Sequence, residues 1–171
     1  VDFRGDAVTL LALDADLDGR LHRTRIPGGG ELALFRALDA QPDGALVSSV
    51  RRTGSTWAAL AEGGSFQVTP EYSESLYTAS PETALDLVRE TDESVTTLVV
   101  VGHNPTMAYL AQLLDDGSGE EEAGREMATG FPPCALAVFE VPGPWSHLDL
   151  ASARLVAFHV TASDSTGRRS N

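Results

Sequence analysis

Five short apolar runs along the chain predict β-strands. Each run is almost continuously apolar and does not alternate between apolar and polar residues, which is typical of strands buried on both faces of a parallel sheet. The first run is bounded by Asp and Gly residues, which favour turns at its ends. The runs cover residues 8–13, 45–49, 96–102, 135–141 and 153–160.

Segments with helical spacing of apolar residues lie between these runs. They predict helices over residues 31–38, 55–62, 81–90 and 105–114, and an acidic loop at 115–126 that enters a further helix through Met127. This alternation predicts an α/β fold: a three-layer sandwich with a mostly parallel central sheet flanked by helices. The last two runs are joined by residues 141–152 without a predicted helix, so we expect them to pair antiparallel at one side of the sheet.

The length of the chain fits one domain. At 171 residues and 18.1 kDa, it can bury a sizeable core. We expect a single domain over residues 1–160. The polar segment 161–171 is expected to be a disordered C-terminal tail.

Charge and composition exclude several classes of protein. The formal net charge is −13, and all 12 basic residues are arginine, which argues against a nucleic-acid or anionic-membrane surface. No apolar run approaches the roughly 20 residues of a membrane-spanning helix, and the N-terminal segment is a poor secretory signal. The lone Cys134 is expected to be a small core residue, with no metal or cofactor implied. We therefore expect a cytoplasmic monomer.

His103 stands where an apolar run ends and a helix begins, in the string VVVGHNPT. In parallel α/β sheets, ligands bind outside the carboxyl ends of the strands. Asn104 suits the N-cap position and Pro105 the first helical position, so the positive end of the helix is expected to face the same crevice. These features predict an anion site. The alternative is a histidine that only closes the end of the strand.

Arg52 follows the second apolar run, in SSVRRTGSTW, one turn before Thr56. A guanidinium group offers a rigid fork of donors that suits bidentate contact with phosphate oxygens. Taken alone, Arg52 and Arg51 read as a solvated surface pair. Because Arg52 and His103 both follow ends of predicted parallel strands, we favour one shared anion pocket.

Together these motifs resemble the histidine phosphatase superfamily, with the greatest similarity to its small SixA-like phosphohistidine phosphatases. The resemblance runs from about residue 45 to residue 160 and includes EYSESLYTASPETALDLVRE and FPPCALAVFEV. It implies a phosphoglycerate mutase-like fold and a phosphorylated protein or small phosphomonoester as the ligand. By resemblance, His103 is the family's second histidine and Arg52 one of its phosphate-binding arginines. Asn104 and Arg23, in HRTRIPGG, are further candidates for phosphate contact.

The sequence departs from the family at the nucleophile. The family carries Arg-His directly after its first strand, whereas this chain has Asp14 and Ala15 there. An alternative alignment onto residues 4–7 leaves no strand ahead of the motif and still lacks the histidine. Alanine cannot attack a phosphoryl group. At about 4 Å, the Asp14 carboxylate would repel a phosphate charge by roughly 4 kcal/mol at an effective dielectric near 20.

Three functions follow from this departure. The first is a SixA-like protein whose phosphatase activity on phosphohistidine or another phosphomonoester is impaired or lost. The second is an active phosphohydrolase with a substitute nucleophile, such as His22, or an activated water. The third is a non-catalytic regulatory module that binds a phosphorylated ligand.

Overall fold

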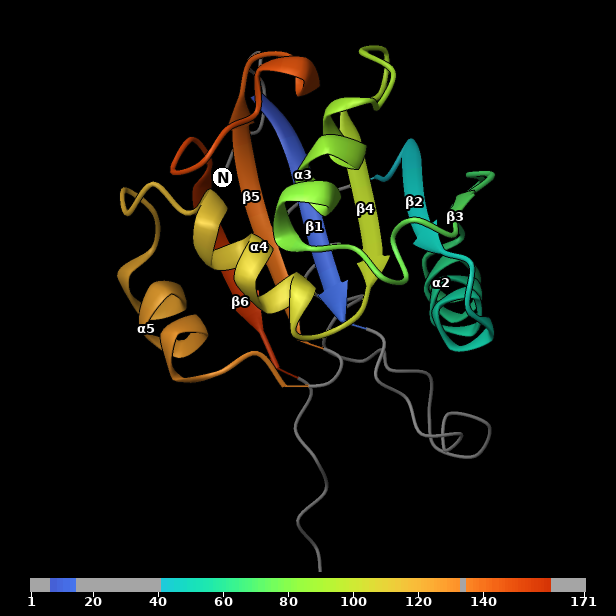
Figure 1. Cartoon of the computed structure of the whole chain (residues 1–171), viewed down its shortest axis with the longest axis horizontal. Helices are drawn as coiled ribbons and strands as arrows, with labels where there is room; N and C mark the ends of the chain where they lie inside the picture. Colours follow the sequence, from blue (N-terminus) through green and yellow to red (C-terminus); the bar gives the residue numbers. More distant parts are fainter. Residues whose placement is uncertain (1–6, 15–40, 133–134, 161–171) are drawn as a thin grey trace, which may run out of the picture.

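A mixed six-stranded sheet forms the centre of the protein in the computed structural model, which describes residues 7–14, 41–132 and 135–160. The strands lie in the order β3-β2-β4-β1-β5-β6 (Figure 1). Within this sheet only β5 runs against the others, because β3, β2, β4 and β1 pair in parallel and β5 pairs antiparallel with both of its neighbours. The strands are β1 Ala7–Asp14, β2 Gly44–Ser48, β3 Glu71–Ser73, β4 Thr97–Gly102, β5 Leu136–Pro142 and β6 Arg154–His159.

The five predicted strands are confirmed to within a residue or so at each end. The antiparallel pairing of the last two is confirmed as well, since Leu136 lies opposite His159. The short edge strand β3 was not predicted, because its three residues carry no apolar run. The mostly parallel α/β sandwich expected from the sequence is therefore the observed fold.

The helices are α2 Arg51–Gly64, α3 Pro81–Arg89, α4 Thr106–Leu114, α5 Glu121–Thr129 and the single 3₁₀ turn η2 Trp145–His147. The helix predicted from residue 55 was placed too late, because α2 already begins at Arg51. The prediction of no helix between the last two strands was wrong at η2. The predicted helix at 31–38, Cys134 and the tail at 161–171 lie outside the described residues.

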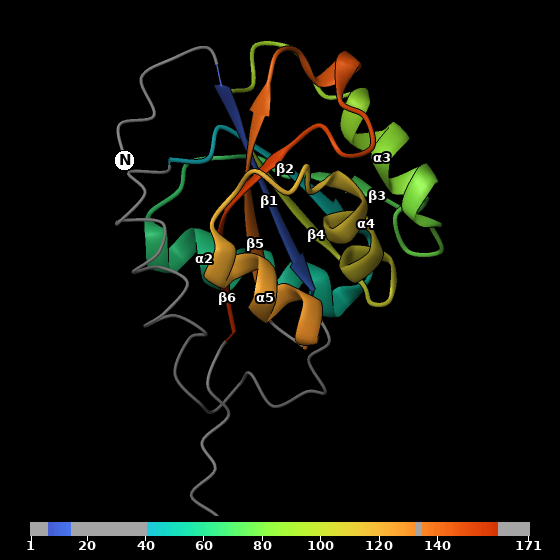
Figure 2. The same ribbon diagram turned by 90° about the vertical axis from the view of Figure 1, so that its left-hand side faces the viewer.

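Helices cover both faces of the sheet (Figure 2). Successive residues of a β-strand point to opposite faces. In β4, Val99 and Val101 pack with Trp57 and Leu60 of α2. The intervening residue Val100 packs in the other core cluster, which the buried sides of α3, α4 and α5 complete.

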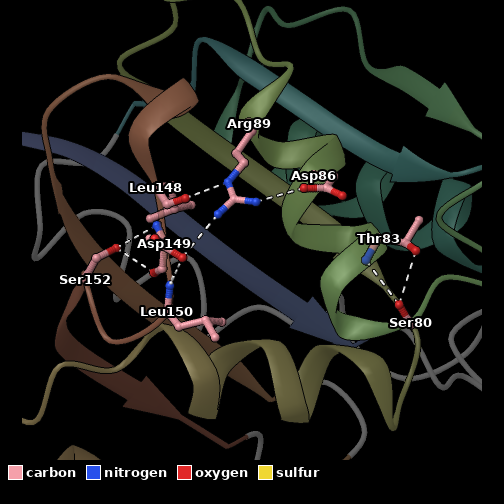
Figure 3. A network of polar contacts seen from close by, with 8 residues as sticks. All are labelled: Ser80, Thr83, Asp86, Arg89, Leu148, Asp149, Leu150 and Ser152. Atoms are coloured by element: carbon pink, nitrogen blue, oxygen red, sulfur yellow. Dashed lines mark hydrogen bonds and ion pairs between the residues drawn. The ribbon is translucent and has the colours of Figure 1, made fainter.

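Arg89 joins α3 to the connection between β5 and β6 (Figure 3). Its Nε donates a hydrogen bond to the Leu148 carbonyl over 2.6 Å. Its guanidinium also contacts Asp86 at 2.8 Å and Asp149 at 3.3 Å. The carbonyl bond is partly buried, so it adds more to stability than the two exposed ion pairs.

We expect Arg89→Ala to lower the free energy of unfolding by about 1–2 kcal/mol, because it leaves the Leu148 carbonyl without this donor. Urea denaturation measures the change. Arg125→Ala is the matched control, since the ion pairs of Arg125 with Glu121 and Glu122 are exposed. We expect it to cost less than about 0.5 kcal/mol. Equal losses in the two variants would contradict the role of the carbonyl bond.

No helix in the described ranges is long and apolar enough to cross a bilayer.

Candidate functional site

Three parallel strands end side by side at one edge of the sheet. β2 ends at Ser48 and β4 at Gly102, and their register pairs Val47 with Val101. β1 ends at Asp14, which lies opposite Gly102. The residues that follow these strands are therefore brought to a common edge.

His103 follows β4 directly and lies almost buried at this edge, with 9% of its surface exposed. Its Nε2 is 2.8 Å from the Ser48 Oγ at the end of β2. The ring of Tyr77 meets the imidazole edge to face, with ring centroids 5.3 Å apart. His103 is thus fixed by two side chains from other segments of the chain.

Arg52 reaches the same imidazole from the first turn of α2. Its Nη2 lies 3.5 Å from His103 Nδ1, the ring nitrogen on the other side from Ser48. This distance is at the limit for a hydrogen bond, so a ligand with better acceptors can replace the contact at little cost. The structure therefore brings the two residues favoured from the sequence into one site, with Arg52 itself exposed to solvent.

The start of α2 has an unusual charge pattern. Its first two residues are Arg51 and Arg52, its first turn has no acidic residue, and Val50 provides no side-chain cap. Positive side chains at this end oppose the helix dipole, whereas an anion there is stabilised. The start of α2 is therefore suited to hold an anion.

Gly102 allows α4 to fold back tightly behind His103. A Cβ atom at this position would lie 2.8 Å from Met107 Sδ. Met107 is fully buried, so its side chain has little room to move away. The glycine in the GHNP string therefore serves the packing that places the histidine.

Asn104 holds the loop between β4 and α4. Its Nδ2 donates to the Phe131 carbonyl over 2.7 Å, and its Oδ1 accepts from the Ala108 amide at 3.2 Å. The prediction of Asn104 as N-cap and Pro105 as first helical residue was wrong by one position: Pro105, after a cis peptide bond, is the N-cap, and α4 begins at Thr106. Asn104 lies one residue before the N-cap, and its side-chain oxygen still accepts a hydrogen bond from the Ala108 amide in the first turn of α4.

The remaining predicted positions are Asp14, Ala15, His22 and Arg23. Asp14 has a described backbone at the end of β1, beside Gly102. Ala15, His22 and Arg23 lie outside the described residues. The strand at Ala7–Asp14 favours the alignment that sets Asp14 and Ala15 at the nucleophile position, because residues 4–7 lie at its start and not after its end.

Two residues of the site were missed from the sequence. Ser48 reads as the last residue of an apolar strand, and its only signal is that position. Tyr77 belongs to a segment between β3 and α3 with no strand or helix signal. Within the described residues, no group of three or more His, Cys, Asp or Glu side chains forms a candidate metal site.

Sequence comparison finds relatives of this chain in mycobacteria. It is 38% identical over 136 residues to the uncharacterized protein Rv1276c of Mycobacterium tuberculosis, covering 79% of this chain and 81% of that protein. It is 40% identical over 89 residues to the uncharacterized protein ML1117 of Mycobacterium leprae, where the match covers 52% of this chain and only 55% of the relative. No protein-family model matches the chain.

Structure comparison gives the fold. The putative phosphohistidine phosphatase SixA from Nakamurella multipartitia superposes with a TM-score of 0.70 at 23% identity, covering 93% of this chain and 99% of that one. A protein histidine phosphatase SixA complexed with tungstate gives 0.62 at 15% identity, with 88% and 95% covered. A phosphoglycerate mutase from Plasmodium falciparum gives 0.59 at 10% identity, with 98% and 99% covered.

Proposed function

We propose that this chain, which belongs to the family of the mycobacterial protein Rv1276c and has the SixA-like histidine phosphatase fold, binds a phosphoryl group between Arg52 and His103. The observation that carries the proposal is the 3.5 Å approach of Arg52 Nη2 to His103 Nδ1 at neighbouring strand ends. The ligand is a phosphohistidine or another phosphomonoester, on a protein or a small molecule. Turnover is lost or greatly reduced.

The electrostatics of the site support an anionic ligand. The chain carries a net charge of −13, so an anion gains no general attraction from the protein and needs a local cluster of cations. Arg51 and Arg52 supply that cluster at the positive end of α2. A guanidinium binds phosphate oxygens in a bidentate manner, and a phosphoryl group offers it more oxygens and more negative charge than a carboxylate does.

The loss of turnover rests on the end of β1. In the family that the chain resembles, the residue after this strand is the attacking histidine, and here it is Ala15. Asp14 replaces the neighbouring arginine, and its backbone lies beside Gly102 at the same sheet edge. A site with Arg52 and His103 but no nucleophile can retain a phosphorylated ligand without cleaving it. Such a protein would act as a regulatory module by binding its phosphorylated ligand. We further propose that it is a cytoplasmic monomer.

We expect wild-type protein to bind phenyl phosphate saturably in calorimetry and to hydrolyse neither p-nitrophenyl phosphate nor a phosphohistidine peptide above background. Arg52→Ala should weaken binding about 10- to 100-fold, because it removes a charge-assisted hydrogen-bond donor. Arg51→Ala, the neighbouring cation of the same turn, is the control and should weaken binding less than about threefold.

Two outcomes would contradict the proposal. Equal effects of the two arginine variants would show that only diffuse charge matters. Hydrolysis that disappears in His103→Ala would show an active phosphohydrolase, and mass spectrometry of the trapped enzyme would then identify its phosphorylated side chain.

A further inference from the structure

Tyr77 is a large aromatic side chain left open at the edge of the candidate site. Its ring meets the His103 ring at an interplanar angle of 78°, with the centroids 5.3 Å apart. Yet 53% of Tyr77 is exposed, so the contact with His103 covers only part of the ring. A single exposed tyrosine is common on protein surfaces, but this one lies against the imidazole of the proposed phosphoryl site.

The backbone that carries Tyr77 is held in place on both sides. The Tyr77 amide donates to the Glu74 carbonyl over 3.1 Å, and the preceding side chain, Leu76, is buried in the larger core cluster. Two residues further on, the Ala79 carbonyl accepts a hydrogen bond from Thr106 Oγ1, at the start of α4, over 2.6 Å. The ring is therefore positioned before a ligand arrives, and a tyrosine loses little conformational entropy when it makes a contact.

Tyr77 lies within reach of the group that carries the phosphoryl. The proposed phosphoryl position is between Arg52 Nη2 and His103 Nδ1, which are 3.5 Å apart. The imidazole is a small ring, so Nδ1 lies no further than one ring radius from the centroid next to Tyr77. A ring joined to that phosphoryl group through one ester oxygen can therefore reach the separation of about 4.5–7 Å at which aromatic rings interact.

Contact with Tyr77 distinguishes flat rings from saturated ones. An aromatic ring has a negative face and a positive edge, and it packs against another aromatic ring in an offset or edge-to-face arrangement. A saturated ring of the same size buries a similar apolar area but lacks this charge distribution. The contact acts on the ring of the ligand and requires no particular protonation state of His103.

We propose that Tyr77 is a specificity-determining residue, and that the site favours phosphoryl groups borne on flat unsaturated rings over those borne on aliphatic alcohols. This inference rests on the proposed phosphate binding and narrows the class of ligand. The ring of the ligand packs on the open part of Tyr77 while Arg52 binds the phosphoryl oxygens. No covalent bond is made or broken.

The test compares phenyl phosphate, cyclohexyl phosphate and inorganic phosphate by calorimetry on the full chain at pH 8. The second pKa of a phosphate monoester is about 6, so both esters carry two negative charges at this pH. We expect phenyl phosphate to bind about three- to tenfold more tightly than cyclohexyl phosphate. If only buried apolar area mattered, the cyclohexyl ester would bind at least as tightly.

Tyr77→Leu keeps apolar bulk beside His103 and removes the aromatic ring. It should reduce the preference for phenyl over cyclohexyl phosphate to less than about twofold and leave the affinity for inorganic phosphate within about twofold of wild type. Tyr77→Phe keeps the ring and should keep the preference. Tyr109→Leu, the same change at a tyrosine of α4 that is 55% exposed, is the matched control and should also keep it.

The outcomes separate the two proposals. Equal affinity of wild-type protein for the two esters, with Arg52→Ala still weakening both, would overturn the role of Tyr77 and leave phosphoryl binding in place. This comparison needs no Tyr77 variant, so the inference stays testable should Tyr77→Leu fail to fold. An equal loss of affinity for all three ligands in Tyr77→Leu would show that Tyr77 only supports His103, which also contradicts the inference. Failure of wild-type protein to bind any of the three ligands would overturn the proposed function itself.

Discussion

Phosphatase activity should rise at least about a hundredfold above background when Asp14→Arg and Ala15→His are combined. The double change returns an imidazole to the position after β1, a strand whose last residue, Asp14, lies in register with Gly102, the residue before His103. It also replaces a negative charge with a guanidinium that can bind phosphate. The measurement is the rate of p-nitrophenyl phosphate hydrolysis, with mass spectrometry of the trapped phosphoenzyme.

Single variants separate binding from chemistry in this experiment. Asp14→Arg alone should tighten phenyl phosphate binding without producing turnover, because it supplies no nucleophile. Adding His103→Ala to the double variant should remove the gained activity. If neither Asp14→Arg nor the double variant binds phenyl phosphate more tightly than wild-type protein, and no phosphoenzyme forms, then the end of β1 does not reach the Arg52 and His103 pocket.

Trp145→Ala should lower the free energy of unfolding by about 3–5 kcal/mol, the range typical of a large aromatic residue removed from a core. Trp145 has no exposed surface and belongs to the larger of the two core clusters. Its Nε1 donates to the Val95 carbonyl over 2.8 Å, which connects η2 to the segment before β4. Urea denaturation followed by circular dichroism measures the change.

Trp145→Phe is the control for this prediction, because it retains much of the packing and removes the indole donor. It should lower the free energy of unfolding clearly less than the alanine variant does.

The two variants should be compared at neutral pH, because hydrogen bonds from Ser146 and from the Trp145 amide lower the pKa of Glu93 below its ordinary 4.5. At pH values above the ordinary pKa, a carboxyl group with a lowered pKa stabilises the folded state. This contribution to stability is lost as the pH falls through the lowered pKa. A loss below about 1 kcal/mol for Trp145→Ala would contradict the packing role.

Much of the sheet could be predicted because each of these strands corresponds to a short continuous apolar run in the sequence. The run at residues 96–102 is buried from Leu98 onward, and the neighbouring strand β2 follows the same pattern. The strand β3 could not be predicted, because Glu71 and Tyr72 are exposed and form no apolar run. Its extended conformation depends mainly on pairing with β2. The start of α2 was placed late because no capping residue precedes Arg51.

The two central residues of the site were predictable because each follows a strand end and precedes a helix. Ser48 and Tyr77 were not, since each becomes part of the site only through a distant contact: Ser48 meets a ring 55 residues further along the chain. Asn104 was correctly placed in the loop before α4 but wrongly predicted as its N-cap. Its side-chain amide bonds the Phe131 carbonyl as well as the first turn of α4, and the sequence did not indicate the contact with Phe131. Local spacing identifies positions, and tertiary contacts decide their partners.

The place of β1 in the sheet sets the order in which the protein can assemble. β1 precedes the other strands that the structure describes, but its two neighbours are β4 at residues 97–102 and β5 at residues 136–142. During synthesis it leaves the ribosome long before either neighbour, with both of its edges unpaired. Such long-range pairing slows folding and exposes apolar strands in the meantime. The sheet can close only once residues 136–142 have emerged, so most of the chain must be made before its central strand is protected.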